Sequence, residues 1–106
     1  MAPDNNLRRL DAAEIAEALE SLEGWVHDPA RAAILLKLDM RDFAEAFGLM
    51  AEIAIVAERA DHHPEWTNVY NRIDIWLTTH DVAGVSPRDI AMARRILDAA
   101  GRRTGA

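Results

Sequence analysis

Apolar residues recur every three or four positions in three parts of the chain, and this spacing predicts three helices. The first is expected over residues 11–22, because Asp11 and Glu14 are spaced to form a capping box and Gly24 stops the apolar run. Residues 1–10 show no such periodicity and are predicted to be a loosely held N-terminal arm.

The second helix is expected over residues 41–60, where Pro64 prevents its continuation. The third is predicted to begin with Pro87 and to be closed by Gly101, which leaves residues 102–106 as a C-terminal tail. The buried stripe of the second helix is predicted to be Phe43, Ala46, Phe47, Met50, Ala54 and Ala57, widened by Ile53 and Val56, and that of the third Ile90, Ala93, Leu97 and Ala100.

Between these helices the pattern changes to alternation, which is typical of strands with one buried face. Residues 25–26 begin a short extended stretch, a turn follows at 28–29, and Ala32, Ile34, Leu36 and Leu38 are predicted to share one face of the next strand. Residues 67–79 alternate too, and predict either a hairpin that turns at Asn71-Arg72 or one bent strand. The order α-β-β-α-β-β-α predicts an α+β fold, with a four-stranded antiparallel sheet and helices on one face.

Length and composition indicate one domain of ordinary soluble type. The chain has 106 residues, of which 50% are hydrophobic and 28% charged, and a single core is expected over residues 11–101. The absence of cysteine excludes disulfides, thiol catalysis and thiolate-bound zinc. The formal charge of −6 disfavours a nucleic-acid partner. Apolar runs too short for a membrane span and the lack of a signal peptide predict a cytoplasmic protein with no membrane partner.

Histidine offers the chemistry in this sequence. His62 and His63 follow the second helix and His80 follows the last predicted strand, and imidazole exchanges protons near neutral pH. A histidine pair in a loop is also commonly solvated surface. A three-histidine zinc site is disfavoured, because neighbouring residues of an extended segment point to opposite sides. Two neighbouring histidines that point to opposite sides are instead suited to act on two positions of a flat substrate.

These histidines belong to a longer pattern, made of an acidic residue, a His-His-Pro triplet, an aromatic residue, a later histidine and a final aspartate. The slots are filled by Glu58, His62, His63, Pro64, Tyr70, His80 and Asp89, within segments 58–66, 68–71, 77–81 and 84–90. Segments 22–25 and 43–50 agree as well. Over residues 11–100, the chain resembles the pterin-4a-carbinolamine dehydratase family.

The resemblance implies an enzyme that dehydrates a 4a-hydroxytetrahydropterin to the quinonoid dihydropterin. It implies no metal and no organic cofactor, because general acid–base catalysis can supply the acceleration. His62, His63 and His80 are then the catalytic imidazoles: His62 or His63 donates the proton to the leaving oxygen, and His80 orients the pterin or exchanges a proton.

Neighbouring residues receive supporting roles in this interpretation. Asp61 and Asp81 flank histidines and are expected to hold a ring tautomer or bind the amino edge of the pterin. Thr78 and Thr79 end a strand and are expected to line the pocket. Glu58, one helical turn before His62, either orients that ring or is a solvated helix charge.

Three further side chains are open to two interpretations. Asp89 is favoured as the capping-box partner of Ser86 over a catalytic group. Trp25 is either core or an apolar wall of the pocket. Pro64 and Trp66 are expected to shape the turn rather than touch the reaction.

Partners follow from the resemblance and from Asp74 and Trp76, predicted on the outward face of the last strand. A large outward aromatic suggests a covered surface, and family members assemble, so a homodimer or homotetramer is expected. The family implies a functional link to an aromatic amino acid hydroxylase. The alternatives are an interaction module, such as a dimerisation cofactor for a homeodomain transcription factor, and a pterin-binding helper in molybdenum-cofactor metabolism.

Overall fold

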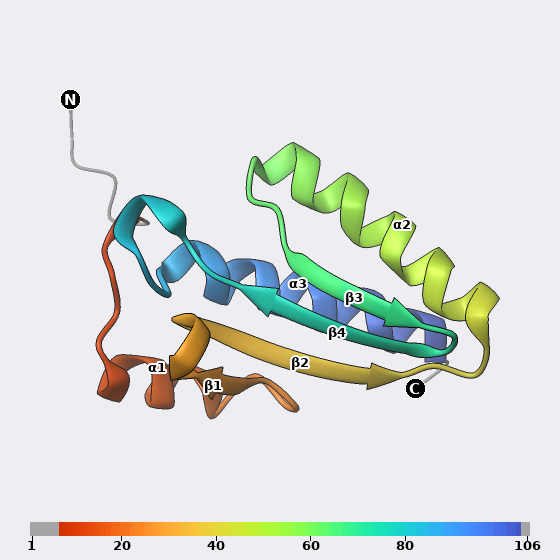
Figure 1. Cartoon of the computed structure of the whole chain (residues 1–106), viewed down its shortest axis with the longest axis horizontal. Helices are drawn as coiled ribbons and strands as arrows, with labels where there is room; N and C mark the ends of the chain where they lie inside the picture. Colours follow the sequence, from red (N-terminus) through yellow and green to blue (C-terminus); the bar gives the residue numbers. More distant parts are fainter. Residues whose placement is uncertain (1–6, 105–106) are drawn as a thin grey trace.

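The computed structural model describes residues 7–104, and it confirms the predicted α+β fold (Figure 1). The strands form one antiparallel sheet in the order β1-β2-β4-β3. The elements are α1 (Ala12–Leu19), β1 (Val26–Asp28), the 3₁₀ turn η2 (Pro29–Arg31), β2 (Ala33–Asp39), α2 (Phe43–Ala60), β3 (Glu65–Val69), β4 (Arg72–Leu77), the 3₁₀ turn η3 (His80–Val82) and α3 (Pro87–Thr104).

The sheet has one covered and one open face, as the alternation predicts. Leu36 of β2 lies opposite Ile75 of β4, and both are buried beneath the helices. One residue further along, Lys37 lies opposite Asp74 on the other face. Figure 1 shows α2 and α3 on the same side of the sheet, with α1 beside β1. Because alternate side chains of a strand point to opposite faces, the core lies between the sheet and the helices.

The predicted stripe of α2 is confirmed in part: Ala46, Ile53 and Ala57 are buried, and Met50 and Val56 pack against the core. Phe43 and Phe47, expected in the core, are 48% and 57% exposed, and Ala54 is exposed too. The residues that α2 buries are Ala46, Leu49, Ile53 and Ala57. Apolar residues occur on two neighbouring faces of this helix, so spacing alone does not choose between them.

Two helix ends differ from the predictions. The capping box of Asp11 and Glu14 is confirmed, but α1 ends at Leu19 rather than at residue 22. Gly101 does not close α3, which continues to Thr104. Ion pairs from this last turn to α2 account for the continuation, since Arg102 and Arg103 both contact Glu52.

The structure describes only part of the predicted N-terminal arm and C-terminal tail, because residues 1–6 and 105–106 lie outside the described residues. The end of the arm is docked: the backbone N–H of Leu10 donates to the carbonyl of Val85 at 2.8 Å, and the Leu10 side chain packs against the core.

Both hairpin turns use a left-handed residue. Ala32, predicted on the strand face, has φ 52° and is exposed ahead of β2. The β3–β4 turn is centred on Tyr70 (φ 52°) and Asn71, one residue earlier than predicted, because Arg72 already belongs to β4. The side chain of Asn71 donates to the carbonyl of Met40 at 2.9 Å, which ties this turn to the end of β2.

The outward position of Trp76 is confirmed, but its ring is covered within the chain. The guanidinium of Arg31 lies 3.9 Å from the ring centroid, and the indole N–H donates to Asp28 Oδ2 at 3.0 Å. The aromatic on the open face is therefore accounted for without a subunit contact.

Candidate active site

A cavity of about 360 Å³ lies where α2 ends, β3 begins and β4 ends. All three predicted catalytic histidines line it. Its lining residues are Asp61, His62, His63, Pro64, Glu65, Thr78, Thr79, His80, Asp81 and Arg88. The left-handed backbone of Asp61 (φ 51°) ends α2 and turns the chain into this region. Two segments far apart in the sequence thus bring their histidines to one cavity.

His62 is the buried member of the set, with 9% of its surface exposed. Its Nε2 lies 2.5 Å from Oδ1 of Asp89, which is fully buried. The other oxygen of Asp89 accepts from the Thr79 hydroxyl and from the Ser86 backbone N–H, both at 2.8 Å. An ionised carboxylate only accepts hydrogen bonds, so Nε2 of His62 donates to Asp89 and Nδ1 is the atom left for a ligand.

Asp89 therefore combines two roles that the sequence treats as alternatives. Its bond from the Ser86 N–H confirms one half of the predicted capping box, while the Ser86 hydroxyl accepts from the Arg88 N–H at 3.2 Å rather than from the N–H of Asp89. The same carboxylate holds the imidazole of His62. Helix α3 and the cavity are consequently joined through one side chain.

His63 has a different partner. Its Nε2 lies 2.9 Å from Oε1 of Glu58, and both side chains are exposed. The prediction that Glu58 orients His62 is wrong, because the backbone N–H of His62 bonds the carbonyl of Ala57 and its side chain turns inward to Asp89. The turn at Asp61 leaves His63 as the histidine that reaches back to the last turn of α2.

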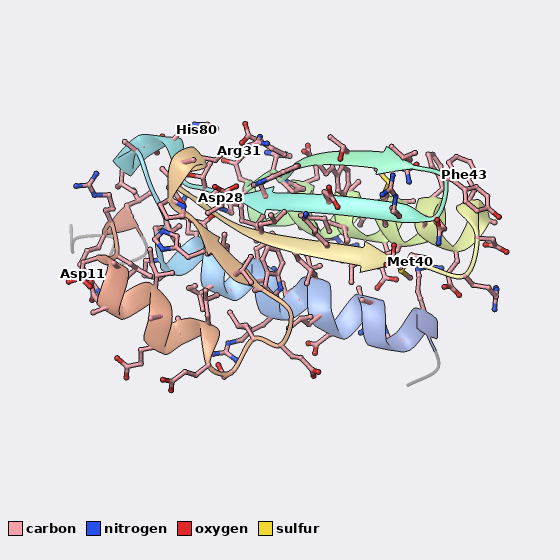
Figure 2. The ribbon with its side chains drawn as sticks, turned by 60° about the horizontal axis from the view of Figure 1, so that its bottom comes forward. Asp11, Asp28, Arg31, Met40, Phe43 and His80 are labelled. Atoms are coloured by element: carbon pink, nitrogen blue, oxygen red, sulfur yellow. The ribbon has the colours of Figure 1, made fainter. Side chains whose placement is uncertain are left out.

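His80, at the start of η3, is the most solvent-accessible of the three (Figure 2). Its Nε2 lies 3.9 Å from Oε2 of Glu65, whose other oxygen is 3.7 Å from Arg31. Sequence reasoning missed Glu65 and Arg88 as cavity residues. The signal for Glu65 was its place directly after the His-His-Pro triplet, at the start of an extended segment.

The two threonines differ in what their hydroxyls do. Both line the cavity, as predicted. Thr79 donates to Asp89, whereas Thr78 donates to the carbonyl of Ala32 at 2.7 Å and so fastens β4 to the turn before β2. Asp61 and Asp81 line the same cavity and are exposed.

The aromatic residues lie elsewhere. Trp25 is 4% exposed in the hydrophobic core and is not part of the cavity wall, so its pocket role is wrong. Trp66 packs against the core from β3, and Tyr70 lies at the opposite end of β3 from His63. Pro64 does line the cavity.

Within residues 7–104, the structure places no group of three or more His, Asp or Glu side chains so that it could hold a metal ion. None of the helices in that range is both long enough and apolar enough to cross a membrane.

Comparison with known proteins identifies the family. The family model described as pterin 4 alpha carbinolamine dehydratase matches residues 8–99, which include every residue of the cavity. The chain belongs to the pterin-4a-carbinolamine dehydratase family. This confirms the resemblance carried by the histidine pattern.

Curated relatives named as members of the dehydratase family match the sequence of this chain over nearly their whole length. A protein of Rhizorhabdus wittichii named "Putative pterin-4-alpha-carbinolamine dehydratase" is 48% identical over 91 residues, covering 86% of this chain and 94% of the relative. A Brucella ovis protein of the same name is 48% identical over 93 residues, covering 88% and 96%.

A solved structure shows the same fold. The crystal structure of a transcriptional coactivator/pterin dehydratase from Brucella melitensis is similar with a TM-score of 0.86 and 48% sequence identity. The match covers 89% of this chain and 100% of that one.

Proposed function

We propose that this protein dehydrates a 4a-hydroxytetrahydropterin to the quinonoid dihydropterin. The observation that supports this best is the buried contact of His62 with Asp89, in a cavity that His63 and His80 also line. An imidazole whose one nitrogen is fixed by a buried carboxylate presents the other nitrogen in a defined direction, which suits proton transfer.

The proposed reaction is an elimination in which water is the only other product. The C4a–O bond breaks, the leaving hydroxyl takes a proton, and N5 loses its proton as the C4a–N5 double bond forms. One group must therefore donate a proton and another must accept one. The site offers imidazoles in two distinct settings, one held by a buried carboxylate and one by an exposed carboxylate.

The different settings favour different roles. We assign His62 as the base at N5, because Asp89 stabilises the imidazolium that forms when Nδ1 takes the proton. We assign His63 as the acid for the leaving hydroxyl, since it is exposed and exchanges protons readily with solvent. His80, beside Glu65, then orients the pterin. Acid–base catalysis of this kind needs no metal or organic cofactor.

A direct spectrophotometric assay of carbinolamine dehydration tests the proposal. Losing a positioned acid or base is expected to lower kcat by about 10²- to 10⁴-fold, so His63→Ala and the His62→Ala/His63→Ala double variant should show losses in this range. His27→Ala is the matched control, because His27 lies on β1, outside the cavity. A folded double variant that dehydrates the substrate at the wild-type rate would overturn the proposed function.

The proposed reaction also defines the proposed partners. The 4a-hydroxytetrahydropterin is the spent form of the cofactor of an aromatic amino acid hydroxylase, and its dehydration is one step in recycling that cofactor, so we propose a link to such an enzyme. We further propose self-association through the exposed apolar strip of α2, which consists of Phe43, Phe47 and Ile55.

A further inference from the structure

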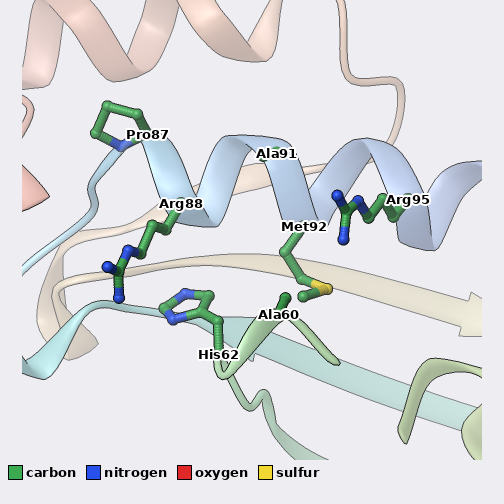
Figure 3. Close-up of a pocket in the computed structure, with 7 residues that line it drawn as sticks. All are labelled: Ala60, His62, Pro87, Arg88, Ala91, Met92 and Arg95. Atoms are coloured by element: carbon green, nitrogen blue, oxygen red, sulfur yellow. The ribbon is translucent and has the colours of Figure 1, made fainter. Parts of the chain in front are cut away.

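A second cavity, of about 290 Å³, adjoins the proposed active site (Figure 3). Its apolar lining includes Ala60, Ala91 and Met92, and its polar lining comprises His62, Arg88 and Arg95. His62 and Arg88 line both cavities. A ligand held against His62 in the first cavity therefore has space beside it for a substituent.

Two arginine side chains, Arg88 and Arg95, line this second cavity. Arg88 and Arg95 are seven residues apart on α3, which is two helical turns, so their side chains leave the helix on the same side. Figure 3 shows both reaching from α3 on the side where His62 and Met92 lie. Within residues 7–104, Arg95 forms no ion pair or hydrogen bond with another side chain, and its guanidinium is available to a ligand.

A further hollow, of about 270 Å³, lies along the groove between α2 and α3. It is lined by Arg95 again, together with Val56, Arg59, Asp98 and Arg102, and Arg102 is ion-paired with Glu52 of α2. The chain as a whole carries 18 acidic and 12 basic residues, with a formal charge of −6. In these two linings the arginines outnumber the one acidic residue, in contrast to the chain as a whole, and they begin beside the proposed catalytic imidazole.

We propose that the substrate of this protein is a pterin with an anionic side chain, whose charged end is held by Arg95 in the second cavity. This inference rests on the proposed dehydratase function and specifies its substrate class. Guanidinium binds phosphate and carboxylate groups through paired, charge-assisted hydrogen bonds. The apolar floor of Ala60, Ala91 and Met92 accommodates the carbon chain that joins such a group to the ring.

Binding of stable pterin analogues tests this inference. The probes are 6-hydroxymethyl-7,8-dihydropterin, its phosphate ester and the corresponding 6-carboxylate, each titrated by isothermal calorimetry. Wild-type protein is expected to bind at least one anionic probe about tenfold more tightly than the neutral probe. A gain for the phosphate alone assigns a phosphorylated substrate, and a gain for the carboxylate alone assigns a carboxylated one.

Substitutions then show whether Arg95 carries the preference. Arg95→Gln is expected to bring the ratio of anionic to neutral affinity close to one, and Arg95→Lys to restore part of it. Arg94→Gln is the matched control: Arg94 is its neighbour on α3, but its guanidinium contacts Ser21 near the end of α1. This variant is expected to keep the wild-type ratio.

Two results would count against the proposal in different ways. If the neutral probe is bound and a neutral 4a-carbinolamine is dehydrated, but the anionic probes bind no better, or Arg95→Gln keeps the preference, the anionic substrate class is wrong and the dehydratase function stands. If no pterin is bound and no carbinolamine is dehydrated, the proposed function fails, and this inference fails with it.

Discussion

At the residue scale, Asp89 is the side chain on which the candidate site depends most. One of its oxygens contacts the imidazole of His62, and the other accepts from Thr79 and Ser86. The carboxylate is fully buried, so its removal would leave the His62 ring N–H and the Ser86 backbone N–H without their acceptor in a dry environment. Loss of this carboxylate is expected to lower both the dehydration rate and the free energy of unfolding.

Replacing Asp89 by Asn removes the negative charge and one accepting oxygen but keeps the size of the side chain. The amide has one accepting oxygen instead of two, so it cannot accept from His62 while also accepting from Thr79 and Ser86 on its other side. We expect Asp89→Asn to lower kcat by about 10²-fold or more and the free energy of unfolding by about 1–3 kcal/mol. The dehydration assay and urea denaturation measure the two effects.

Thr79→Val is the control for this substitution, because Thr79 donates to the oxygen that does not face His62. It should lower stability with a smaller loss of kcat. Equal kcat in Asp89→Asn and wild type would mean that the carboxylate serves only the helix cap.

The sequence predicts which residues gather in the site better than it predicts how they pair. His62, His63 and His80 were expected together, and they line one cavity. Of the two roles predicted for Glu58, orienting His62 is wrong: Glu58 is an exposed charge that contacts His63, because the left-handed turn at Asp61 precedes the histidine that turns inward. Aspartate adopts this backbone state more readily than most residues, but the sequence does not specify which residue of the segment adopts it.

At the scale of elements, the capping signal at the start of α1 predicts the structure correctly, whereas the buried face of α2 and the end of α3 depend on contacts between elements. The cap of α1 depends on two side chains three residues apart, so its sequence signature is complete. The stripe of α2 depends on what packs against it, and two apolar faces compete. The end of α3 depends on the contacts of Arg102 and Arg103 with Glu52 of α2, so glycine at position 101 does not end the helix.

The α1 cap gives a pH-dependent prediction. The pKa of Glu14 is lowered from its ordinary value of 4.5, first by the hydrogen bond from the Asp11 backbone N–H and then by Arg8. The folded state therefore favours the ionised carboxylate. Its contribution to stability is fully present above pH 4.5 and is lost as the pH falls through the lowered pKa.

We accordingly expect Glu14→Ala to reduce the urea midpoint at pH 7 and to differ less from wild type at pH 3. Glu17→Ala, an exposed glutamate of the same helix, controls for the loss of a surface charge. A Glu14→Ala deficit that is the same at both pH values would contradict the assignment.

At the scale of the whole molecule, the sheet carries the core on one face, and the candidate site lies where α2, β3, β4 and α3 have adjacent ends. The fold was predictable because strand alternation and helix spacing each imply a covered face. Surfaces were less predictable: Trp76 is covered by Arg31 of the same chain, whereas Phe43 and Phe47 lie outside with ring centroids 5.9 Å apart.

This exposed strip leads to a prediction about assembly. If copies of the chain associate through α2, Phe47→Lys should shift the molar mass measured by light scattering towards the monomer, because a charge would be buried against apolar surface. Val69→Lys, which alters an exposed apolar residue of β3, should leave the mass unchanged. An assembly that survives Phe47→Lys uses another surface.

The position of Asp89 in the first turn of α3 has a consequence for heat sensitivity. Helix termini open more readily than helix centres on warming, and the first turn of α3 also supports the imidazole at position 62. Warming should therefore extinguish turnover below the temperature of global unfolding, and cooling should restore it without any need for refolding.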